Sequence, residues 1–406
     1  MPYKQKITRK FFKYISIEIE YTDEKANIIC KFFNKIKIRH KLFNPLLNKF
    51  FCKLTNIKTL LIVRFDGIGD FLLTRPFFKN IKESAKFKDY KIIFMGKPDF
   101  VDLAKKYDYE YIDSFIGLNI DIPLDRKILK KLAKKSYADY LINPCDHKCN
   151  KHLENFVATI KAKNKICHKG FFSYYDIKSN NKLRTINCLK KYNRIIDTGE
   201  NVRFVLDKNK LFFEKIINEK IQEVPDLIDL NNIVNDIVSV NFDYILISPF
   251  SRSEIRTYSP ENFGKIINYI IQNLNIPVII MGSIFENKSA EYIRNLCINP
   301  QMVYNMAGQL TINESALLIK NAKLLIANET GTVHIAKNFR TTTICISNGS
   351  YMNTFQPYPE KYMNYIYPDN IEQILTNNDD AGTLIDYDIN KIDPNKVINK
   401  IKEIML

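Results

Sequence analysis

The sequence predicts an α/β protein built from two Rossmann-like, doubly wound domains that face a central cleft. Short apolar runs rich in β-branched residues alternate with segments of helical spacing, which is the pattern of a parallel sheet covered by helices. The alternation lapses around residues 218–243 and then resumes, so a second series follows the first. A chain of 406 residues is also long for one domain and ample for two.

Each series has its own strands and helices. In the first, we expect strands at 59–65, 90–96, 111–117 and 138–144, with helices at 71–84, 97–107 and 125–137. In the second, we expect strands at 244–250, 276–282, 302–308, 323–328 and 341–347, with helices at 259–274, 286–297, 311–322 and 329–339. We therefore divide the chain into an N-terminal extension (1–56), a first domain (57–225), a second domain (240–375) and a closing helical region (376–406).

The composition is that of a soluble globular protein, with 46% hydrophobic and 26% charged residues. No apolar run approaches the length of about 18 residues that a transmembrane helix needs. The N-terminus lacks the apolar core and cleavage site of a signal peptide, so we expect a cytoplasmic protein.

The eight Cys residues are scattered at irregular intervals, and we expect reduced, mostly buried thiols. One cluster, "CDHKCNKH", gathers Cys145, His147, Cys149 and His152, with Cys167 and His168 further on. Zinc sites favour Cys-x2-Cys pairs backed by a second pair, and neither is present here. We favour an ordinary loop over a zinc site and predict no metal.

The basic charge is concentrated in the N-terminal extension. Of the net charge of +17, the first 56 residues contribute 13 Lys and Arg against 4 Asp and Glu, or +9, interleaved with aromatic residues. Such a segment suits an anionic inner-leaflet membrane surface or an anionic glycolipid, with nucleic acid as the competing partner and a solvated Lys-rich surface as the simplest reading. We predict membrane contact through residues 1–56 and no nucleic acid.

Three turns at expected strand ends carry polar residues, and ligands of open α/β sheets bind beyond those ends. The first is "DGIGD", which is a poor dinucleotide fingerprint because Leu72 stands where a third Gly is needed. Its informative residue is Asp70, a carboxylate that either faces the cleft or caps the following helix.

The second turn, "NETGTVH", suits a phosphate. Thr330, Gly331 and Thr332 offer backbone N–H groups at a helix N-terminus, where the helix dipole favours anions. Glu329 can accept hydrogen bonds from ribose or sugar hydroxyls, and His334 lies one turn on. The alternative is a helix capped by Thr with a packed His.

The third turn is "MGSIFEN", and the loop "SPFSRSEIRTYS" follows the end of another expected strand. The loop brings Arg252 and Arg256, whose guanidinium groups suit diphosphate oxygens. Solvated loop arginines are the alternative reading.

Together these pieces resemble glycosyltransferase family 9, the lipopolysaccharide heptosyltransferases, over about residues 57–370. The family pattern has an R-x-x-x-x-G-D turn before a helix with Pro, here "RFDGIGDFLLTRP", and a K-x-W-P anion loop, here "RTYS" before "PENF". A G-x-x-x-E turn follows, here "GSIFE", and the pattern closes with D-[ST]-G-x-x-H-x-A, here "ETGTVHIA". Glu329, Arg256 and Tyr258 depart from the family's Asp, Lys and Trp, which puts the identity of the donor in doubt.

The resemblance implies the GT-B architecture and an inverting, metal-independent transfer without a cofactor. A sugar, with heptose from ADP-heptose as the candidate, would pass from a nucleotide sugar to an anionic, lipid-linked surface saccharide. Asp70 falls at the proposed general base, Arg256 at the lysine that meets the leaving diphosphate, and Glu286 at the residue that contacts the nucleoside. The donor-binding set implied is Ser251, Arg252, Arg256, Gly282, Glu286, Glu329, Thr330, Gly331, Thr332 and His334, and the acceptor side comprises Gly67, Gly69 and Arg75.

Two other functions stay open at this stage. A nucleotide-sugar epimerase on the same scaffold would need no acceptor. A non-catalytic member would bind glycans or membranes through its basic extension and release no nucleoside diphosphate. A peripheral position at the inner membrane is expected only if the extension contacts lipid.

Overall fold

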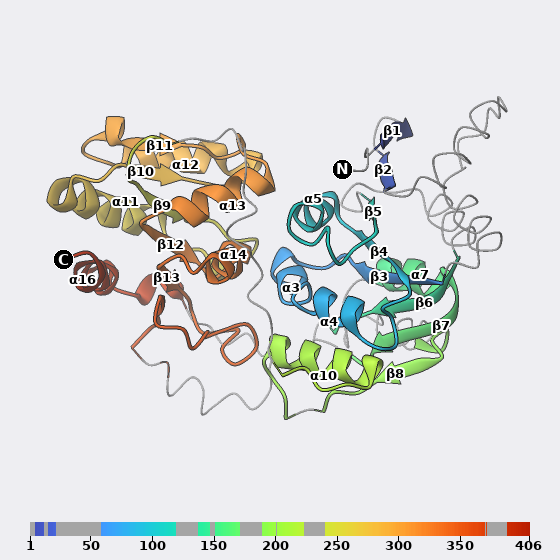
Figure 1. The fold of residues 1–406 in the computed structure, drawn as a ribbon. Coiled ribbons are helices and arrows are strands. Elements are labelled where there is room, and N and C mark those ends of the chain that lie inside the picture. Colours follow the sequence, from blue (N-terminus) through green and yellow to red (C-terminus); the bar gives the residue numbers. More distant parts are fainter. Residues whose placement is uncertain are drawn as a thin grey trace. The chain divides into compact units, whose positions relative to one another are not determined.

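The computed structural model describes residues 5–11, 15–21, 58–118, 137–146, 151–170, 189–199, 201–222, 240–369, 371 and 388–406. The chain divides into two compact units, Met1–Pro225 and Asp226–Leu406. Each contains a six-stranded sheet in which all neighbouring strands are parallel, as Figure 1 shows.

The sheet of unit 1 has the strand order β5-β4-β3-β6-β7-β8. Its strands are β3 (Thr59–Arg64), β4 (Lys91–Gly96), β5 (Ser114–Gly117), β6 (Tyr137–Asn143), β7 (Lys161–His168) and β8 (Arg194–Ile196). Every residue of the central strand β3 is buried, as expected for a parallel strand covered on both faces. The reversal of strand order between β3–β4 and β3–β6 makes this sheet doubly wound.

Helices α3 (Ile68–Leu72), α4 (Phe77–Glu83), α5 (Pro98–Tyr107), α7 (Lys151–Thr159) and α10 (Val205–Ile217) accompany this sheet. Aromatic pairs hold several of them together. Phe71 of α3 stacks on Phe100 of α5 at 5.0 Å between ring centroids, and Phe77 of α4 stacks on Phe213 of α10 at 5.3 Å. These pairs join α3 to α5 and α4 to α10.

The sheet of unit 2 has the strand order β11-β10-β9-β12-β13-β14. Its strands are β9 (Ile245–Ser248), β10 (Val278–Ile280), β11 (Val303–Asn305), β12 (Leu324–Asn328), β13 (Thr343–Ile346) and β14 (Met363–Ile366). The helices are α11 (Pro260–Tyr269), continued by a π-helical turn η3 (Ile270–Leu274), then α12 (Asn287–Asn295), α13 (Ile312–Asn321), α14 (Gly331–Phe339) and α16 (Pro394–Met405). Ile residues dominate the core between the sheet and these helices.

The prediction of two doubly wound, Rossmann-like domains is confirmed. The expected helix at 125–137 lies outside the described residues except for Tyr137, which begins β6. The structure adds α7, β7, β8, α10 and β14, which the sequence analysis did not assign, and an antiparallel hairpin in the basic extension. The hairpin pairs β1 (Gln5–Phe11) with β2 (Ile15–Tyr21), from Gln5 opposite Tyr21 to Phe11 opposite Ile15.

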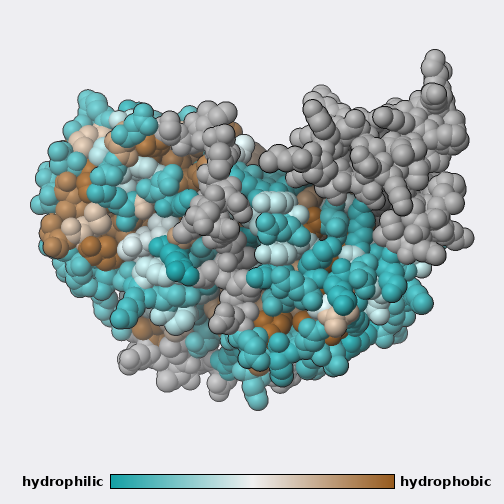
Figure 2. Space-filling model, in the orientation of Figure 1, coloured by the Kyte–Doolittle hydropathy of each residue, from teal (hydrophilic) through white to brown (hydrophobic). Residues whose placement is uncertain are grey.

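The described surface seen in Figure 2 is mainly hydrophilic on both units, with hydrophobic residues gathered on unit 2 near the side where Figure 1 places α11 and α16. Among the described residues, no helix has the length and apolar character needed to span a membrane.

Candidate functional site

The first polar turn joins β3 to α3 in unit 1. Gly67 is the residue before the helix, and the carboxylate of Asp70 bends back so that Oδ2 accepts a hydrogen bond from the Gly67 N–H at 3.1 Å. A side chain at position 67 would displace the Asp70 carboxylate, because its Cβ would lie 2.6 Å from that oxygen. Asp70 therefore caps the start of α3, which was the structural alternative to a role facing the cleft. The same hydrogen bond fixes the position of its carboxylate.

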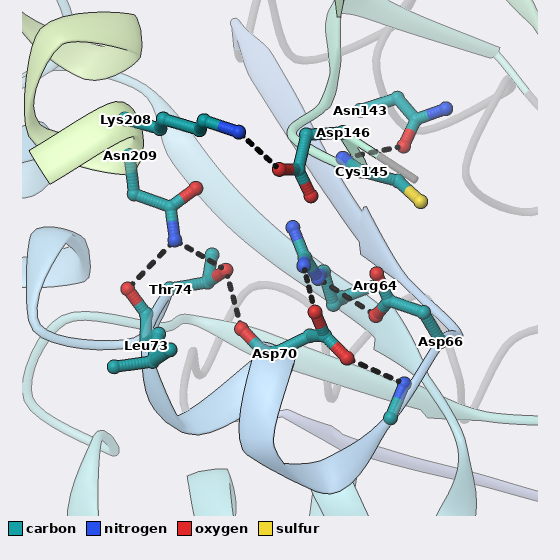
Figure 3. Close-up of polar contacts among 11 residues, drawn as sticks. Arg64, Asp66, Asp70, Leu73, Thr74, Asn143, Cys145, Asp146, Lys208 and Asn209 are labelled. Atoms are coloured by element: carbon teal, nitrogen blue, oxygen red, sulfur yellow. Dashed lines mark hydrogen bonds and ion pairs between the residues drawn. The ribbon is translucent and has the colours of Figure 1, made fainter. Parts of the chain in front are cut away.

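A buried arginine joins the two carboxylates of this turn. The Arg64 side chain has no exposed surface, its Nε donates to Asp66 Oδ1 at 2.7 Å, and its Nη2 lies 3.4 Å from Asp70 Oδ1. Figure 3 shows the guanidinium group of Arg64 between Asp70 and Asp146. The positive charge of Arg64 thus lies close to several acidic groups.

The neighbouring strand β6 supplies the last acidic group, since β3 and β6 are adjacent and parallel. Asp146 follows the end of β6 with a side chain only 4% exposed, and the Nζ of Lys208 from α10 lies 3.7 Å from its Oδ2. On the same helix, Asn209 Nδ2 donates to the Leu73 carbonyl at 2.8 Å, which anchors the end of α3 (Figure 3).

This environment makes Asp70 an unusually strong base for a carboxylate. Burial and the negative charge of Asp66 raise the pKa of Asp70 from 3.8 to about 8, against the opposing effect of Arg64. The side chain nevertheless keeps 19% of its surface exposed. A partly exposed carboxylate with this proton affinity is suited to accept a proton from a hydroxyl group.

Arg75 lies in the interior of unit 1. Its side chain is 2% exposed, and its Nε and Nη2 donate to the two carboxylate oxygens of Asp108 at 2.9 and 2.8 Å. This bidentate buried pair stabilises the packing of unit 1, and a role of Arg75 on the acceptor side stays a prediction. Gly69 belongs to α3, where its carbonyl accepts from Leu73 N at 3.0 Å.

In unit 2 the turn after β12 leads into α14, whose first residue is Gly331. Thr330 precedes the helix but does not cap it. Its hydroxyl pairs with that of Thr332 at 2.8 Å, which in turn lies 3.2 Å from Ser248 Oγ. Within the part of the chain that the structure describes, the backbone N–H groups of Gly331 and Thr332 meet no acceptor. The helix start is therefore open to an anion.

Glu329 lies at the same turn with its carboxylate turned inward. It is 6% exposed, and Oε2 accepts from Ser347 Oγ and Gln356 Nε2, both at 2.8 Å. Burial raises the pKa of Glu329 from 4.5 to about 7, although the Ser347 hydrogen bond and Arg256 oppose this. The carboxylate thus holds the 347–356 segment, and a contact with a sugar hydroxyl stays a prediction.

His334 is buried one turn into α14. Its Nδ1 lies 2.7 Å from the Tyr358 hydroxyl, and burial lowers the pKa of His334 from 6.5 to about 4. The ring is consequently neutral near pH 7, so it can act only as a neutral hydrogen-bonding group.

Arg256 ends the short 3₁₀ helix η2 (Glu254–Arg256), which lies in the loop after β9. Its Nη1 donates to the Glu329 carbonyl at 3.3 Å, and its guanidinium carbon lies 4.9 Å from the Tyr351 ring centroid. Strands β9 and β12 are adjacent and parallel, so Arg256 and the start of α14 lie at one edge of the sheet. In the same loop Arg252 is exposed, and Ser251 Oγ accepts from Ser253 N at 3.4 Å.

The turn after β10 carries the remaining predicted residues. Glu286 Oε2 accepts from Ser283 N at 2.6 Å, which closes the 3₁₀ helix η4 (Ile284–Glu286). A Cβ on Gly282 would lie 2.8 Å from the Phe250 ring, so only Gly fits there. Within the described chain, no contact joins Glu286 to Arg256 or to Glu329. The loops after β9, β10 and β12 are related only because these parallel strands end at the same edge of the sheet.

The cysteine loop provides no metal centre among the described residues, where no cluster of His, Cys, Asp and Glu suits a metal. Cys145 and Cys167 are buried and reduced, and His168 contacts Thr198 and the Gly170 N–H. His147, Cys149 and the His152 side chain lie outside the described residues.

Comparison with known protein families gives one match. Residues 182–378 match the model of glycosyltransferase family 9 (heptosyltransferase). This match confirms the resemblance drawn from the motifs and the prediction of a glycosyltransferase. None of the curated proteins compared with the chain matches it in sequence.

Solved structures of family 9 proteins share the fold. Heptosyltransferase WaaC of E. coli, solved with ADP-2-deoxy-2-fluoro heptose, is 14% identical with a TM-score of 0.62, covering 85% of this chain and 99% of that one. A family 9 protein from Veillonella parvula is 13% identical with a TM-score of 0.61, covering 86% and 97%. ADP-heptose lipopolysaccharide heptosyltransferase II of E. coli is 12% identical with a TM-score of 0.58, covering 85% and 98%. These likenesses confirm the GT-B type of fold.

Four residues of the Asp70 cluster received no role from the sequence: Arg64, Asp66, Asp146 and Lys208. Arg64 and Asp66 stand in the quoted "RFDGIGD", and the rule that ligands bind at strand ends also applies to Asp146, directly after β6. Only Lys208 carried no signal, because it approaches from a helix that was not assigned.

Proposed function

We propose that this protein transfers a sugar from a nucleoside diphosphate donor to a hydroxyl group of a surface saccharide, with inversion at the anomeric carbon and without a metal ion. The observation that carries the proposal is the open N-terminus of α14 beside Arg256 in unit 2. Backbone N–H groups at a helix start and a guanidinium fork are the groups that bind a diphosphate.

The chemistry divides between the two units. Asp70 removes the proton from the acceptor hydroxyl as its oxygen bonds to the anomeric carbon. The bond from that carbon to the diphosphate oxygen breaks, and the nucleoside diphosphate leaves with its new negative charge stabilised by Arg256 and the α14 N-terminus. The family match supports heptose as the sugar. The similar structures, one solved with an ADP-heptose analogue and one of an ADP-heptose lipopolysaccharide heptosyltransferase, support ADP-heptose as the donor and a lipopolysaccharide-type acceptor.

The location of the protein is part of the proposal. Its basic, aromatic residues 1–56 would hold the protein against the inner face of an anionic membrane, where a lipid-linked acceptor is reached. The test is co-sedimentation with vesicles of neutral and of anionic lipid, using the full chain and a chain that begins at residue 57.

Donor class is tested by thermal unfolding with ADP, GDP, UDP, CDP and NAD in the presence of EDTA. A ligand at about 100 times its dissociation constant stabilises a protein by about 2.7 kcal/mol. We expect a shift with ADP and none with NAD. Stabilisation by NAD alone would contradict the proposal.

The two alternatives are separated by product. Incubation with ADP-heptose and acceptor should release ADP and lengthen the saccharide. An epimerised sugar nucleotide formed without acceptor would indicate an epimerase. Binding of saccharide with no release of ADP from any donor would indicate a non-catalytic protein.

A further inference from the structure

The buried Arg64 guanidinium is shared unequally by two carboxylates. Its Nε makes a short, charge-assisted contact to Asp66 at 2.7 Å, whereas Asp70 receives only the longer Nη2 contact at 3.4 Å. Both Nη atoms of Arg64 and the Oδ2 of Asp66 are buried and form no hydrogen bond within the described chain. Arg64 therefore forms a close ion pair with Asp66 and only a longer contact with Asp70.

We propose that Asp66 is a positioning residue for the general base: by holding Arg64 through Nε, it keeps the guanidinium from pairing closely with Asp70 and so preserves the basicity of that carboxylate. The catalytic role of Asp70 in this inference rests on the proposed function. The effect of Asp66 on the pairing of Arg64 does not depend on it. No motif in the sequence assigns a role to Asp66.

Without Asp66, Arg64 would lose its close partner. An unpaired buried guanidinium is strongly unfavourable, so it would turn to the nearest remaining carboxylate. A close pair with Arg64 would stabilise the ionised form of Asp70 and make it a weaker base. The negative charge of Asp66 acts in the same direction as its hold on Arg64, because a neighbouring anion disfavours ionisation of Asp70.

The groups around Asp70 come from several elements. Arg64 from β3 and the Gly67 N–H favour its ionised form, whereas Asp66 in the turn and Asp146 after β6 oppose it. Lys208 from α10 is directed at Asp146, with its Nζ 3.7 Å from Oδ2. Among the charged neighbours, Asp66 has the largest effect in raising the pKa of Asp70.

The first test needs no substrate. The carboxyl carbons of Asp residues are labelled with ¹³C, and the signal of Asp70 is identified by its loss in Asp70→Asn. We expect its titration midpoint near pH 8 in the native protein and at least about one pH unit lower in Asp66→Asn. Asp66→Glu, which keeps the charge, should stay near the native value. An Asp66→Asn midpoint equal to the native one would overturn the proposal.

The matched control is Asp139→Asn. Asp139 of β6 is a partly buried carboxylate that also lies beside β3, but at the opposite end of that strand. It accepts hydrogen bonds from Thr59 N and Oγ1 at 2.8 and 3.2 Å. The same isosteric change there should perturb the fold without moving the titration of Asp70. A shift as large as that of Asp66→Asn would show a general structural effect and refute the specific role.

The second test reads catalysis through the release of ADP from ADP-heptose in the presence of acceptor. At high pH, Asp66→Asn should be slower than the native protein because its base is weaker. As the pH falls from about 9 to about 6, the ratio of the Asp66→Asn rate to the native rate should rise at least about tenfold, since the weaker base stays ionised. A ratio constant across this range would mean a merely structural loss. Absence of ADP release from the native protein would refute the proposed function, and the titration of Asp70 would still decide the role of Asp66.

Discussion

The carboxylate of Asp70 accepts a hydrogen bond from the backbone N–H of Gly67, three residues earlier, at 3.1 Å. This contact makes the position of the proposed base depend on the absence of a side chain at residue 67. A Cβ there would meet Asp70 Oδ2 at 2.6 Å and push the carboxylate away.

We therefore predict that Gly67→Ala lowers the rate of sugar transfer at least about tenfold, because misplacement of a catalytic group by a fraction of an ångström to an ångström is costly. The effect on the free energy of unfolding should be about 1 kcal/mol or less, because the side chain of Asp70 can move. The control is Gly117→Ala, where a Cβ would make only ordinary contacts, the nearest at 3.6 Å. Equal rates of sugar transfer for the native and Gly67→Ala proteins would contradict the role of Asp70 as the general base.

Glu329 should make the stability of the protein depend on pH. Because burial raises its folded-state pKa to about 7 from the ordinary 4.5, its contribution to stability is fully present below pH 4.5 and is lost as the pH rises through 7. We predict that Glu329→Gln is more stable than the native protein near pH 8, by up to about 3 kcal/mol.

Urea unfolding of both proteins from about pH 4.5 to about pH 8 measures this difference. The advantage of Glu329→Gln should disappear toward the acid end, where the native carboxyl is protonated. A difference that stays constant with pH would show that Glu329 is not the group that titrates.

Arg256 should contribute to the binding of the donor diphosphate. We predict that Arg256→Met raises the dissociation constant of ADP about 10- to 100-fold, the loss of a charge-assisted hydrogen bond worth about 1.5–3 kcal/mol. Titration calorimetry in the presence of EDTA measures it. Arg252→Met in the same loop should have a smaller effect, because Arg252 is exposed. Unchanged ADP affinity in Arg256→Met would move the diphosphate away from the start of α14.

The buried pair of Arg75 and Asp108 should govern stability and leave acceptor binding unchanged. Asp108→Ala leaves an uncompensated buried guanidinium, for which we expect a loss of about 3–5 kcal/mol in the free energy of unfolding. The double variant Arg75→Met, Asp108→Leu should recover most of this loss, because both charges are replaced by apolar groups. The double variant should also keep the native KM for the acceptor. A raised acceptor KM in a stable double variant would support the predicted role of Arg75 in acceptor binding.

The strands of both sheets could be predicted where they are buried on both faces, as "TLLIVR" of β3 and "LLIAN" of β12 show. Strand β7 was missed because its first half, "KAKNK", alternates polar residues and is half exposed. Strand β8, with the sequence "RII", was missed because it follows the polar run "KKYN" and two of its three residues are exposed. Position at a strand end therefore identified Asp70 and Glu329, but not the partners that set their chemistry.

Some of those partners are distant in sequence. Asp146 reaches the Asp70 site through the pairing of β6 with β3, and Ser347 and Gln356 reach Glu329 from the segment that follows β13. Burial is the main cause of the raised pKa of both carboxylates, and burial depends on the folded chain, so no spacing rule could have predicted it. The inward turn of Glu329 is the clearest case, because the sequence suggested a carboxylate available to a sugar.

The most direct measurement is the release of ADP from ADP-heptose by native protein and by Asp70→Asn, in EDTA, with the truncated surface saccharide from cells lacking this protein as acceptor. Removal of a general base typically costs about 10²- to 10⁴-fold in rate. We predict metal-independent, acceptor-dependent release by the native protein, with a loss in that range for Asp70→Asn and no loss of ADP binding. Transfer at the native rate by a folded Asp70→Asn protein would contradict the role of Asp70 as the base.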